Sequence, residues 1–436
     1  MIFLYDLGIQ LYLLIIRIVA LRNKKARQWV NGQKNIVQNI SAQISTNQPC
    51  IWFHFASLGE FEQGRPVMEQ VKNDNPDEKL VITFFSPSGY EIRKHNALSA
   101  DTFYLPIDTK ENARALISVI NPKIAVFTKY EYWYHYYKEL HSRNIPIYII
   151  SANFRKGMSF FKWYGVLNRK MLKFVTHFFV QNAVSKENLK LLNYTNVTVT
   201  GDTRFDRVMH SAMHPKKLDL IQAFCMNNKV FIGGSTWPEE EVLIAQLIKE
   251  YPDWKFILAP HEIDEDKIAK LEEKLHGKSV RYSQILESEA GSRELDTSDT
   301  SQYPSEPIFI RVGPVLNTQY AILIIDNIGM LSSLYQYASI AYIGGAFGAG
   351  LHNVLEAAAF GIPVIFGPKY NRFPEAGDLI ERGAGFSIQN MDDLRGIMKM
   401  LQDDAKRSSA GKAARKYVVE NTGATQLIMD HIRAAL

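Results

Sequence analysis

The sequence predicts an α/β fold built from two doubly wound domains that face each other across a cleft. Three observations lead to this prediction. Short apolar runs, typical of buried parallel strands, alternate with helical segments along most of the chain. Many of these runs end in turns of small residues, and the strand–helix series starts afresh near residue 230. The length of 436 residues fits two or three domains.

The chain begins with a strongly apolar segment, residues 1–28. Asp6, Gln10 and Arg17 interrupt it, so it falls short of the roughly 18 uninterrupted apolar residues expected of a transmembrane helix. Four basic residues between positions 22 and 27 follow, and such a cluster favours the cytoplasmic side of a membrane. We expect a membrane-associated helix, inserted into the membrane or lying on its inner, cytoplasmic face. The alternative is an ordinary apolar helix of the first domain.

The first domain is expected over residues 29–210. Its apolar runs predict five strands: Cys50–Phe55, Leu80–Phe85, Ile124–Thr128, Ile147–Ser151 and Phe178–Gln181. Helical segments separate them, which is the βαβ pattern of a parallel sheet with helices on both faces. The segment Thr198–Asp206 ends this half of the chain.

The second domain is expected over residues 211–415. Its predicted strands are Val230–Gly233, Phe256–Ala259, Ala321–Ile325, Ser339–Ile343 and Val364–Phe366. The polar segment Ser283–Pro307 is interpreted as a surface excursion. A last helix is expected over about Gly411–Leu436, and we expect its part from residue 416 to cross back to the first domain.

Charge and cysteine content limit the kinds of function that are expected. The net charge of +5 is mildly basic, and we find no stripe in which basic and aromatic residues gather, so nucleic-acid binding is not expected. An anionic membrane surface or a phosphorylated ligand also fits this charge. Cys50 and Cys225 provide no disulfide framework and no cysteine-based metal site, and no zinc-type histidine spacing occurs. Neither pattern predicts a metal site, and no cofactor is expected.

The most informative stretch is residues 341–368, AYIGGAFGAGLHNVLEAAAFGIPVIFGP. A strand leads into Gly344 and Gly345, and a helix is expected from about His352 to Phe360. Glycines at that point let the backbone approach a ligand, and the helix N-terminus favours negative charge. Three polar side chains are expected on the first helical turn, where they could reach the same crevice: His352, Asn353 and Glu356. The stretch predicts a nucleotide site, although without the P-loop sequence.

Glu60 is the candidate catalytic carboxylate. It follows Ser57 and Gly59 in a turn between a strand and a helix. As a general base it would take a proton from an attacking hydroxyl group. As a structural residue it would cap the helix and interact with the helix dipole.

Ser235 and Thr236 are expected to open the first helix of the second domain. Their hydroxyl groups and the free N–H groups there could hold a phosphate, or they could be plain N-caps. The glutamates at 239–241 are interpreted as acidic residues of the first helical turn, which the helix dipole favours. Glu356 would bind ribose hydroxyl groups or make a structural hydrogen bond. Lys369, Asn371 and Arg372 would offset phosphate charge or lie in a solvated loop.

Together these residues resemble a known family. The stretch from Gly344 to Pro368 is similar to the nucleotide-sugar motif of GT-B glycosyltransferases, and more closely to that of the Kdo (3-deoxy-D-manno-octulosonic acid) transferases of lipopolysaccharide biosynthesis. Five further runs support the resemblance in the same order: FHFASLGE at 53–60, KYEYWY at 129–134, GDTRFD at 201–206, GSTWPEEE at 234–241 and DNIGMLSSLYQYASIAYIGG at 326–345.

The resemblance implies two Rossmann-like domains, with the acceptor bound by the first and CMP-Kdo by the second. It implies that Glu60 is the base of an inverting transfer of Kdo to a lipid A precursor of the lipid IVA type, without a metal. The donor-binding residues that it implies are Ser235, Thr236, His261, Gly344, Gly345, His352, Asn353 and Glu356. On the acceptor side it implies Ser57, Gly59 and Glu131.

The sequence departs from the family at three places. Ala259-Pro260-His261-Glu262 stands where an Arg-His pair is common, and Arg311 is a candidate replacement for the arginine. The Asn-Ala-Arg run expected near residues 151–155 is shifted or lost, and a Trp-Pro pair is Trp-Tyr at 133–134. The alternatives are a GT-B transferase that uses a UDP-sugar and a lipid-linked acceptor, and a catalytically inactive binding protein, which the acidic Glu60 and Glu356 oppose.

Overall fold

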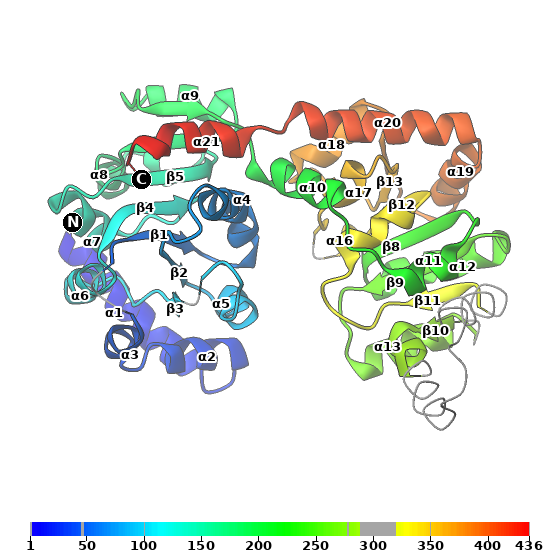
Figure 1. The fold of residues 1–436 in the computed structure, drawn as a ribbon, viewed down its shortest axis with the longest axis horizontal. Coiled ribbons are helices and arrows are strands. Elements are labelled where there is room, and N and C mark those ends of the chain that lie inside the picture. The colour runs from blue at the N-terminus through cyan, green and yellow to red at the C-terminus, as the bar shows by residue number, and fades with distance from the viewer. Residues whose placement is uncertain are drawn as a thin grey trace, which may run out of the picture. The chain divides into compact units, whose positions relative to one another are not determined.

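The computed structural model describes residues 2–44, 48–99, 101–276, 279–287, 320–348 and 350–435. The chain divides into two compact units. Unit 1 consists of residues 1–207 and 421–436, and unit 2 consists of residues 208–420. Figure 1 shows both with their elements labelled. Arg311 and most of the segment Ser283–Pro307 lie outside the described residues.

Unit 1 is built on a parallel sheet, which has seven strands in the described part of the chain, in the order β3-β2-β1-β4-β5-β6-β7. After β1 the chain adds β2 and β3 on one side of it and then β4 to β7 on the other, so the strand order reverses between β1 and β4. In open α/β sheets ligands bind at such a reversal, at the carboxyl ends of the strands. The strands are β1 (Cys50–Phe55), β2 (Leu80–Phe84), β3 (Asp101–Tyr104), β4 (Pro122–Thr128), β5 (Ile147–Ala152), β6 (His177–Val180) and β7 (Val197–Val199).

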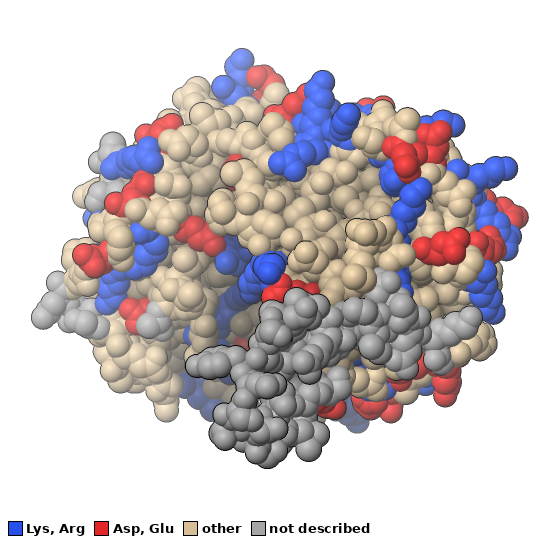
Figure 2. Space-filling view, turned by 45° about the vertical axis from the view of Figure 1, so that its right-hand side comes forward, with Lys and Arg blue, Asp and Glu red and all other residues tan. Residues whose placement is uncertain are grey.

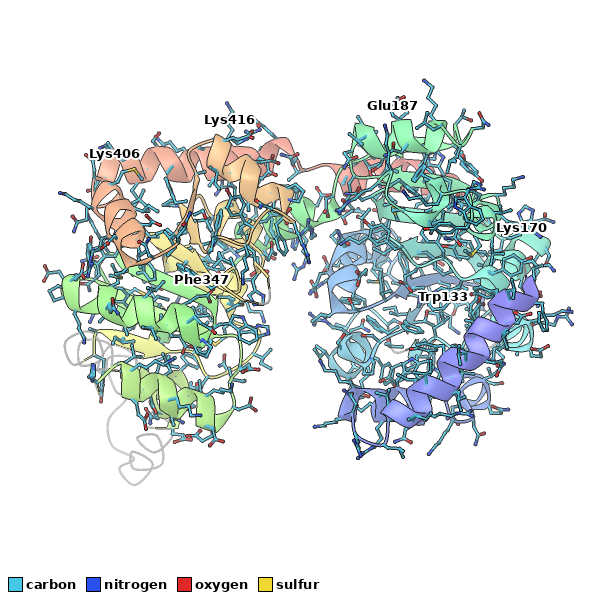
Figure 3. All side chains as sticks on the ribbon, turned by 180° about the vertical axis from the view of Figure 1, so that it is seen from behind. Trp133, Lys170, Glu187, Phe347, Lys406 and Lys416 are labelled. Carbon is cyan, nitrogen blue, oxygen red and sulfur yellow. The ribbon has the colours of Figure 1, made fainter. Side chains whose placement is uncertain are left out.

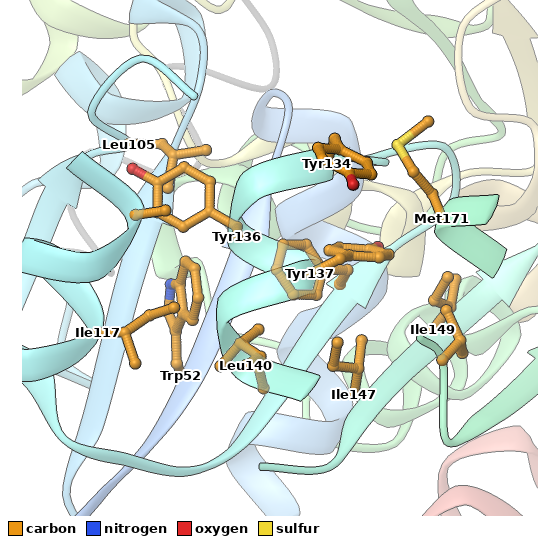
Figure 4. Packing of buried hydrophobic residues seen from close by; sticks show 14 of the residues in the cluster. Trp52, Leu105, Ile117, Tyr134, Tyr136, Tyr137, Leu140, Ile147, Ile149 and Met171 are labelled. Atoms are coloured by element: carbon orange, nitrogen blue, oxygen red, sulfur yellow. The ribbon is translucent and has the colours of Figure 1, made fainter. Parts of the chain in front are cut away.

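Both faces of this sheet are buried. Along β1, Trp52 packs in one apolar cluster, whereas Ile51, Phe53 and Phe55 pack in another. Because successive side chains of a strand point to opposite faces, helices must cover both sides. Figure 4 shows the first cluster, where Trp52 lies among side chains of α7 (Tyr134–Ser142) and neighbouring elements.

The other helices of unit 1 precede, connect or follow these strands. They are α1 (Ile2–Val19), α2 (Lys24–Gly32), α3 (Ile36–Gln43), α4 (Leu58–Asp74), α5 (Pro87–Arg93), α6 (Lys110–Ile120), η1 (Ser159–Phe161), α8 (Val166–Leu172), α9 (Ala183–Lys190), α21 (Ala424–Ile432) and η4 (Arg433–Ala435). Helix α10 (Thr203–Met213) contains the passage into unit 2.

Helix α1 packs against unit 1 through one face. The Tyr5 hydroxyl group donates a hydrogen bond to the buried Asp108 carboxylate, and Asp6 Oδ1 lies 2.6 Å from His135 Nε2. On the opposite face apolar side chains such as Phe3, Leu4 and Leu7 are exposed. Helix α1 is long enough and apolar enough to cross a membrane, with a mean hydropathy of 1.9.

Helix α21 completes unit 1 from the far end of the chain. Ile428, Met429 and Ile432 are fully buried in the second apolar cluster. The Asp206 carboxylate accepts hydrogen bonds from the backbone N–H groups of Gly423 (2.6 Å) and Thr425 (2.7 Å). Asp206 thereby holds the start of α21 beside α10.

Unit 2 contains a second parallel sheet, again of seven strands among the described residues, in the order β10-β11-β9-β8-β12-β13-β14. Its order reverses between β8 and β12. The strands are β8 (Val230–Thr236), β9 (Lys255–Pro260), β10 (Ser279–Arg281), β11 (Ile322–Ile324), β12 (Ile340–Ile343), β13 (Val364–Phe366) and β14 (Gly385–Ser387).

Helices cover this sheet as well. They are α11 (Asp219–Cys225), α12 (Pro238–Glu250), α13 (Glu265–Lys274), α16 (Leu331–Leu334), η3 (Tyr335–Tyr337), α17 (Leu355–Ala359), α18 (Pro374–Glu381), α19 (Met391–Leu401) and α20 (Asp404–Glu420). On the face shown in Figure 2, Lys and Arg side chains alternate with Asp and Glu.

The predicted class of two doubly wound α/β domains is confirmed, and three details need correction. The helix expected from His352 begins at Leu355, so His352 and Asn353 lie in the preceding loop. Ser235 and Thr236 end strand β8 and do not open a helix. The single helix expected over Gly411–Leu436 is two helices, because the chain turns at Gly423, whose φ of 107° is left-handed.

Candidate active site

Glu60 lies at the carboxyl end of β1, beside the reversal in the strand order of unit 1. It is on the first turn of α4, is partly buried, and accepts a hydrogen bond from the Ser57 hydroxyl group. Ser57 occupies the N-cap position, but its side chain makes no hydrogen bond to the helix backbone. Gly59 is exposed, and the nearest atom to a side chain at that position would be Ser57 Oγ. Ser57 therefore orients the carboxylate and does not cap the helix.

The end of β4 brings further groups to Glu60. Burial is the main cause of the raised pKa of Tyr130; Arg155 lowers this pKa and the Glu60 charge raises it, so both charges act on the Tyr130 hydroxyl group. Lys129, the residue before Tyr130, has a left-handed φ of 56°. Non-glycine residues in this conformation are uncommon and tend to occur at functional sites.

Glu131 belongs to a buried hydrogen-bond chain. Its Oε2 lies 3.1 Å from His54 Nε2 and accepts a bond from Trp133 Nε1 at 3.0 Å. On the other side of the imidazole ring, His54 Nδ1 lies 2.9 Å from the Thr83 hydroxyl oxygen. The hydroxyl group can donate to Nδ1, so that Nε2–H donates to Glu131. Glu131 is thus fixed in place as a hydrogen-bond acceptor. Trp133, one of its two donors, is labelled in Figure 3.

In unit 2 the glycine loop after β12 lies against the end of β8. A side chain at Gly344 would come within 2.1 Å of the Ser235 carbonyl oxygen, so only glycine fits. Gly345 has a φ of 95°, and Ser235 itself has a left-handed φ of 52°. The glycine loop and the end of β8 therefore touch through their backbones at the reversal point.

Glu240, which the sequence pattern indicated only as a first-turn acid, joins the glycine loop to the residue that follows β8. Its side chain is fully buried. Oε1 accepts the Gly345 N–H at 2.8 Å, and Oε2 accepts the Trp237 N–H at 2.9 Å. Burial raises the pKa of the carboxyl group to about 7, although these hydrogen bonds favour the charged form. Glu240 therefore titrates near neutral pH.

Two histidines and a tryptophan stack beside this loop. The Trp237 ring stacks on His261, with centroids 4.7 Å apart, and His261 lies 4.5 Å from His352. Burial, together with the neighbouring His261, lowers the pKa of His352 to about 4. His352 is thus neutral at pH 7, and its Nε2 accepts a hydrogen bond from Trp237 Nε1 at 3.2 Å. It provides a polar aromatic surface and no positive charge.

Thr236 faces a cavity at the carboxyl ends of β8 and β9. Its buried hydroxyl oxygen has no hydrogen-bond partner among the described residues. The cavity measures ≈ 400 Å³, and its wall includes Trp237, Pro260 and the lysines of α13: Lys267, Lys270 and Lys274. At the start of α12, however, the Glu240 carboxylate already binds the Trp237 N–H, and Glu239 and Glu241 lie on either side of it in the sequence. A phosphate at that helix end would meet negative charge.

Asn353, at the end of the glycine loop, pairs with Glu356 on the first turn of α17. Asn353 Nδ2 donates to Glu356 Oε1 at 3.0 Å. Burial raises the pKa of the Tyr335 hydroxyl group, and the Glu356 charge contributes, so these side chains are close. The Tyr335 hydroxyl oxygen lies where a side chain at Gly234 would be. This places Glu356 near the end of β8, so the candidate donor residues of unit 2 lie at the ends of β8, β9 and β12.

Of the loop residues after β13, Lys369 is tied to the glycine stretch. It is exposed, and its Nζ donates to the Phe347 carbonyl oxygen at 2.7 Å. Asn371 and Arg372 are exposed. In the described ranges no group of three or more His, Cys, Asp and Glu side chains is placed to hold a metal ion.

Comparison with known protein families points to one group. Residues 32–207 match the family model described as 3-deoxy-D-manno-octulosonic-acid transferase (kdotransferase). A protein of that name from Haemophilus influenzae is 26% identical over 88% of this chain and 87% of its own length. The Rickettsia typhi protein of the same name is 24% identical over 92% of this chain and 82% of its own length.

Solved structures share the fold. UDP-GlcNAc 2-epimerase from Neisseria meningitidis aligns with a TM-score of 0.59 and 15% identity, over 88% of this chain and 99% of the other. MurG from Acinetobacter baumannii aligns with a TM-score of 0.52 and 11% identity, over 88% and 100% of the two chains. At these identities the likeness concerns the fold alone.

Proposed function

Because this chain is a homologue of the Kdo transferases and a glycosyltransferase with a GT-B-like fold, we propose that it transfers Kdo from CMP-Kdo to a lipid A precursor of the lipid IVA type. The observation that carries this proposal is Glu60. This carboxylate lies at the strand-order reversal of unit 1, oriented by Ser57, inside the region that matches the family model.

Glu60 acts as the general base. A hydroxyl group of the acceptor sugar gives its proton to the carboxylate while its oxygen bonds to the anomeric carbon of Kdo. The bond from that carbon to the CMP phosphate oxygen breaks, CMP leaves with the electron pair, and the anomeric configuration inverts. CMP leaves as a phosphate monoester, which hydrogen-bond donors and basic side chains can stabilise without a metal.

The residues of unit 2 hold the donor. Asn353 and Glu356 bind the ribose hydroxyl groups, and the closely packed glycines Gly344 and Gly345 let the nucleotide approach the backbone. Ser235 and Thr236 offer hydroxyl groups at the end of β8. Neutral His352 and stacked His261 contribute ring surfaces.

The acceptor is a lipid, and α1 brings the protein to it. We place the protein on the cytoplasmic face of the inner membrane, with the exposed apolar face of α1 in the bilayer surface. The bonds of Tyr5 and Asp6 hold the opposite face against unit 1. This contact favours a helix that lies along the membrane over one that crosses it.

Replacing the base tests the proposal. Glu60→Gln keeps the size of the side chain but cannot take up the proton, so transfer falls at least about 100-fold while CMP-Kdo binding is unchanged. CMP-Kdo generated in situ and a tetraacylated lipid A precursor are the substrates, and mass spectrometry counts the products. The matched control is Glu69→Gln on the same helix, where Glu69 pairs only with Arg65 among the described ion pairs. Full activity of Glu60→Gln, or binding of UDP-sugars in preference to CMP-Kdo, would reject the proposal.

A further inference from the structure

Unit 1 contains a long stretch without acidic residues. Residues 140–186 include eight Lys and Arg and no Asp or Glu. Contrary to the expectation from the sequence, basic and aromatic side chains do gather here, in the segment between β5 and α8. We call residues 155–166 the aromatic turn. It has Lys156 and Lys162 on its surface.

Two large aromatic side chains project from the aromatic turn into solvent. Trp163 is 87% exposed and Tyr164 is 59% exposed, and their rings meet edge to face at 5.6 Å. Exposed apolar side chains of this size that lie together mark an interaction site. Tryptophan and tyrosine favour the interface between membrane and water, because each combines an apolar ring with a polar group.

The turn that presents them is firmly built. Arg169 Nη1 donates to the carbonyl oxygens of Phe160 (2.9 Å) and Lys162 (2.8 Å). Phe160 is buried between Tyr132 and Phe154, with ring centroids 4.9 and 5.6 Å away. The fold thus holds the turn in place, while no apolar side chain in the described part of the chain buries Trp163 or Tyr164.

The aromatic turn leads directly into α8, which lies beside the N-terminal end of α1. Lys170 Nζ is 5.7 Å from the centre of the Tyr134 ring, and Tyr5 packs on the same ring at 5.9 Å. Figure 3 shows Lys170 close to the end of α1. Residues 7–59, which include most of α1, also lack Asp and Glu and contain six Lys and Arg.

We propose that Trp163 and Tyr164, with Lys156 and Lys162, form a second contact with an anionic lipid bilayer. This inference rests on the proposed membrane attachment through α1. The rings enter the headgroup region, and the lysines neutralise lipid phosphates. A nucleic acid would also suit exposed rings and basic groups, but it would leave the neighbouring apolar face of α1 uncovered.

A label at the turn tests the contact. Both native cysteines are buried, and burial raises the pKa of each thiol to about 12, so a new cysteine can be labelled selectively. The full chain with Trp163→Cys carries an environment-sensitive NBD dye. We expect a blue shift with vesicles of phosphatidylcholine and phosphatidylglycerol, and none with phosphatidylcholine alone. Leu191→Cys is the control, because Leu191 is also an exposed apolar residue of unit 1 and should give no shift.

Charge removal provides the second measurement. Lys156→Gln and Lys162→Gln should each weaken vesicle affinity about fivefold in a sedimentation assay. Vesicle sedimentation without a shift of the label would reject the second contact and leave attachment through α1 intact. A shift caused by a single-stranded oligonucleotide, or by raised protein concentration without vesicles, would also overturn it. No donor or acceptor is present, so a failure of the proposed transfer reaction cannot produce these results.

Discussion

At the scale of single residues, Glu240 shows how one buried carboxyl group can organise a binding loop. It bonds to Trp237 after β8 and to Gly345 after β12, so it fixes the distance between two loops that belong to different strands. Its neighbours Glu239 and Glu241 are respectively exposed and paired with Lys274. Three consecutive glutamates therefore have three different environments.

The raised pKa of Glu240 predicts a pH dependence of stability. Between the ordinary value of 4.5 and about 7, the folded protein holds a proton that the unfolded chain releases. The stabilisation is therefore fully present below pH 4.5 and is lost as the pH rises through 7. Between pH 5 and pH 8, Glu240→Gln should lose less unfolding free energy than the wild type. Urea unfolding at both pH values measures this difference. Glu239→Gln, on the same turn but exposed, should behave like the wild type; an equal effect of both variants would contradict the assignment.

The glycine loop makes a second prediction, from two glycines four positions apart. Gly344→Ala places a methyl group 2.1 Å from the Ser235 carbonyl oxygen, and such overpacking typically costs about 1–3 kcal/mol of unfolding free energy. We also expect weaker CMP-Kdo binding, because the two loops must separate. Gly348→Ala is the matched control, since no described atom beyond its chain neighbours lies within 4 Å of its new methyl group. Thermal unfolding and donor titration measure both variants, and similar losses in the two would refute the packing argument.

The candidate site was only partly predictable from the sequence. Glu60 and Gly344 could be found because each follows an apolar strand, and strand ends meet at one edge of a parallel sheet. His54 and Glu240 could not, because their roles depend on partners far away in the chain: Glu131 is 77 positions from His54, and Gly345 is 105 from Glu240. A histidine inside the apolar run Cys50–Phe55 was the one available indication.

At the scale of elements, every strand predicted from the sequence exists, and the four further strands in the described part of the chain are the sheet edges. They are β3, β7, β10 and β14. Each has only three or four residues, and sequences such as SVR and GFS contain no apolar run. A central strand is buried on both faces and must be apolar throughout, whereas an edge strand need not be. The period of apolar residues therefore reveals the middle of a sheet better than its borders.

Helix α1 gives a prediction at this scale. Tyr5→Phe removes the hydroxyl group that bonds to Asp108, whose carboxylate also accepts the N–H groups of His135 and Tyr136 at 3.1 Å. Because Asp108 is buried, we expect a loss of about 1–3 kcal/mol in unfolding free energy and a looser α1. Protease cleavage after Arg17 or Arg22 measures the loosening. Tyr12→Phe is the control, since among the described contacts Tyr12 packs on Trp29 with its ring and not with its hydroxyl group. Equal protease sensitivity of the two variants would contradict the role of the Tyr5–Asp108 hydrogen bond.

At the scale of the whole molecule, unit 2 is one continuous segment and unit 1 is not. Ending the chain at Glu420 removes the buried side chains of α21 and the N–H groups bound by Asp206. We expect calorimetry of this truncated chain to show the transition of unit 2 and to lose that of unit 1. Removing only residues 433–436 should preserve both transitions. A truncated chain with two intact transitions would disprove the structural role of α21.

The position of α21 also has a consequence for biosynthesis. The ribosome releases the first 207 residues early, but the helix that covers part of their apolar sheet emerges only after residues 208–420. At about 5–20 residues per second, that interval lasts roughly 10–40 s. During this time unit 1 exposes the surface that Ile428, Met429 and Ile432 later bury. The domain synthesised first is therefore the one finished last, and it is where a newly made chain most needs protection by chaperones.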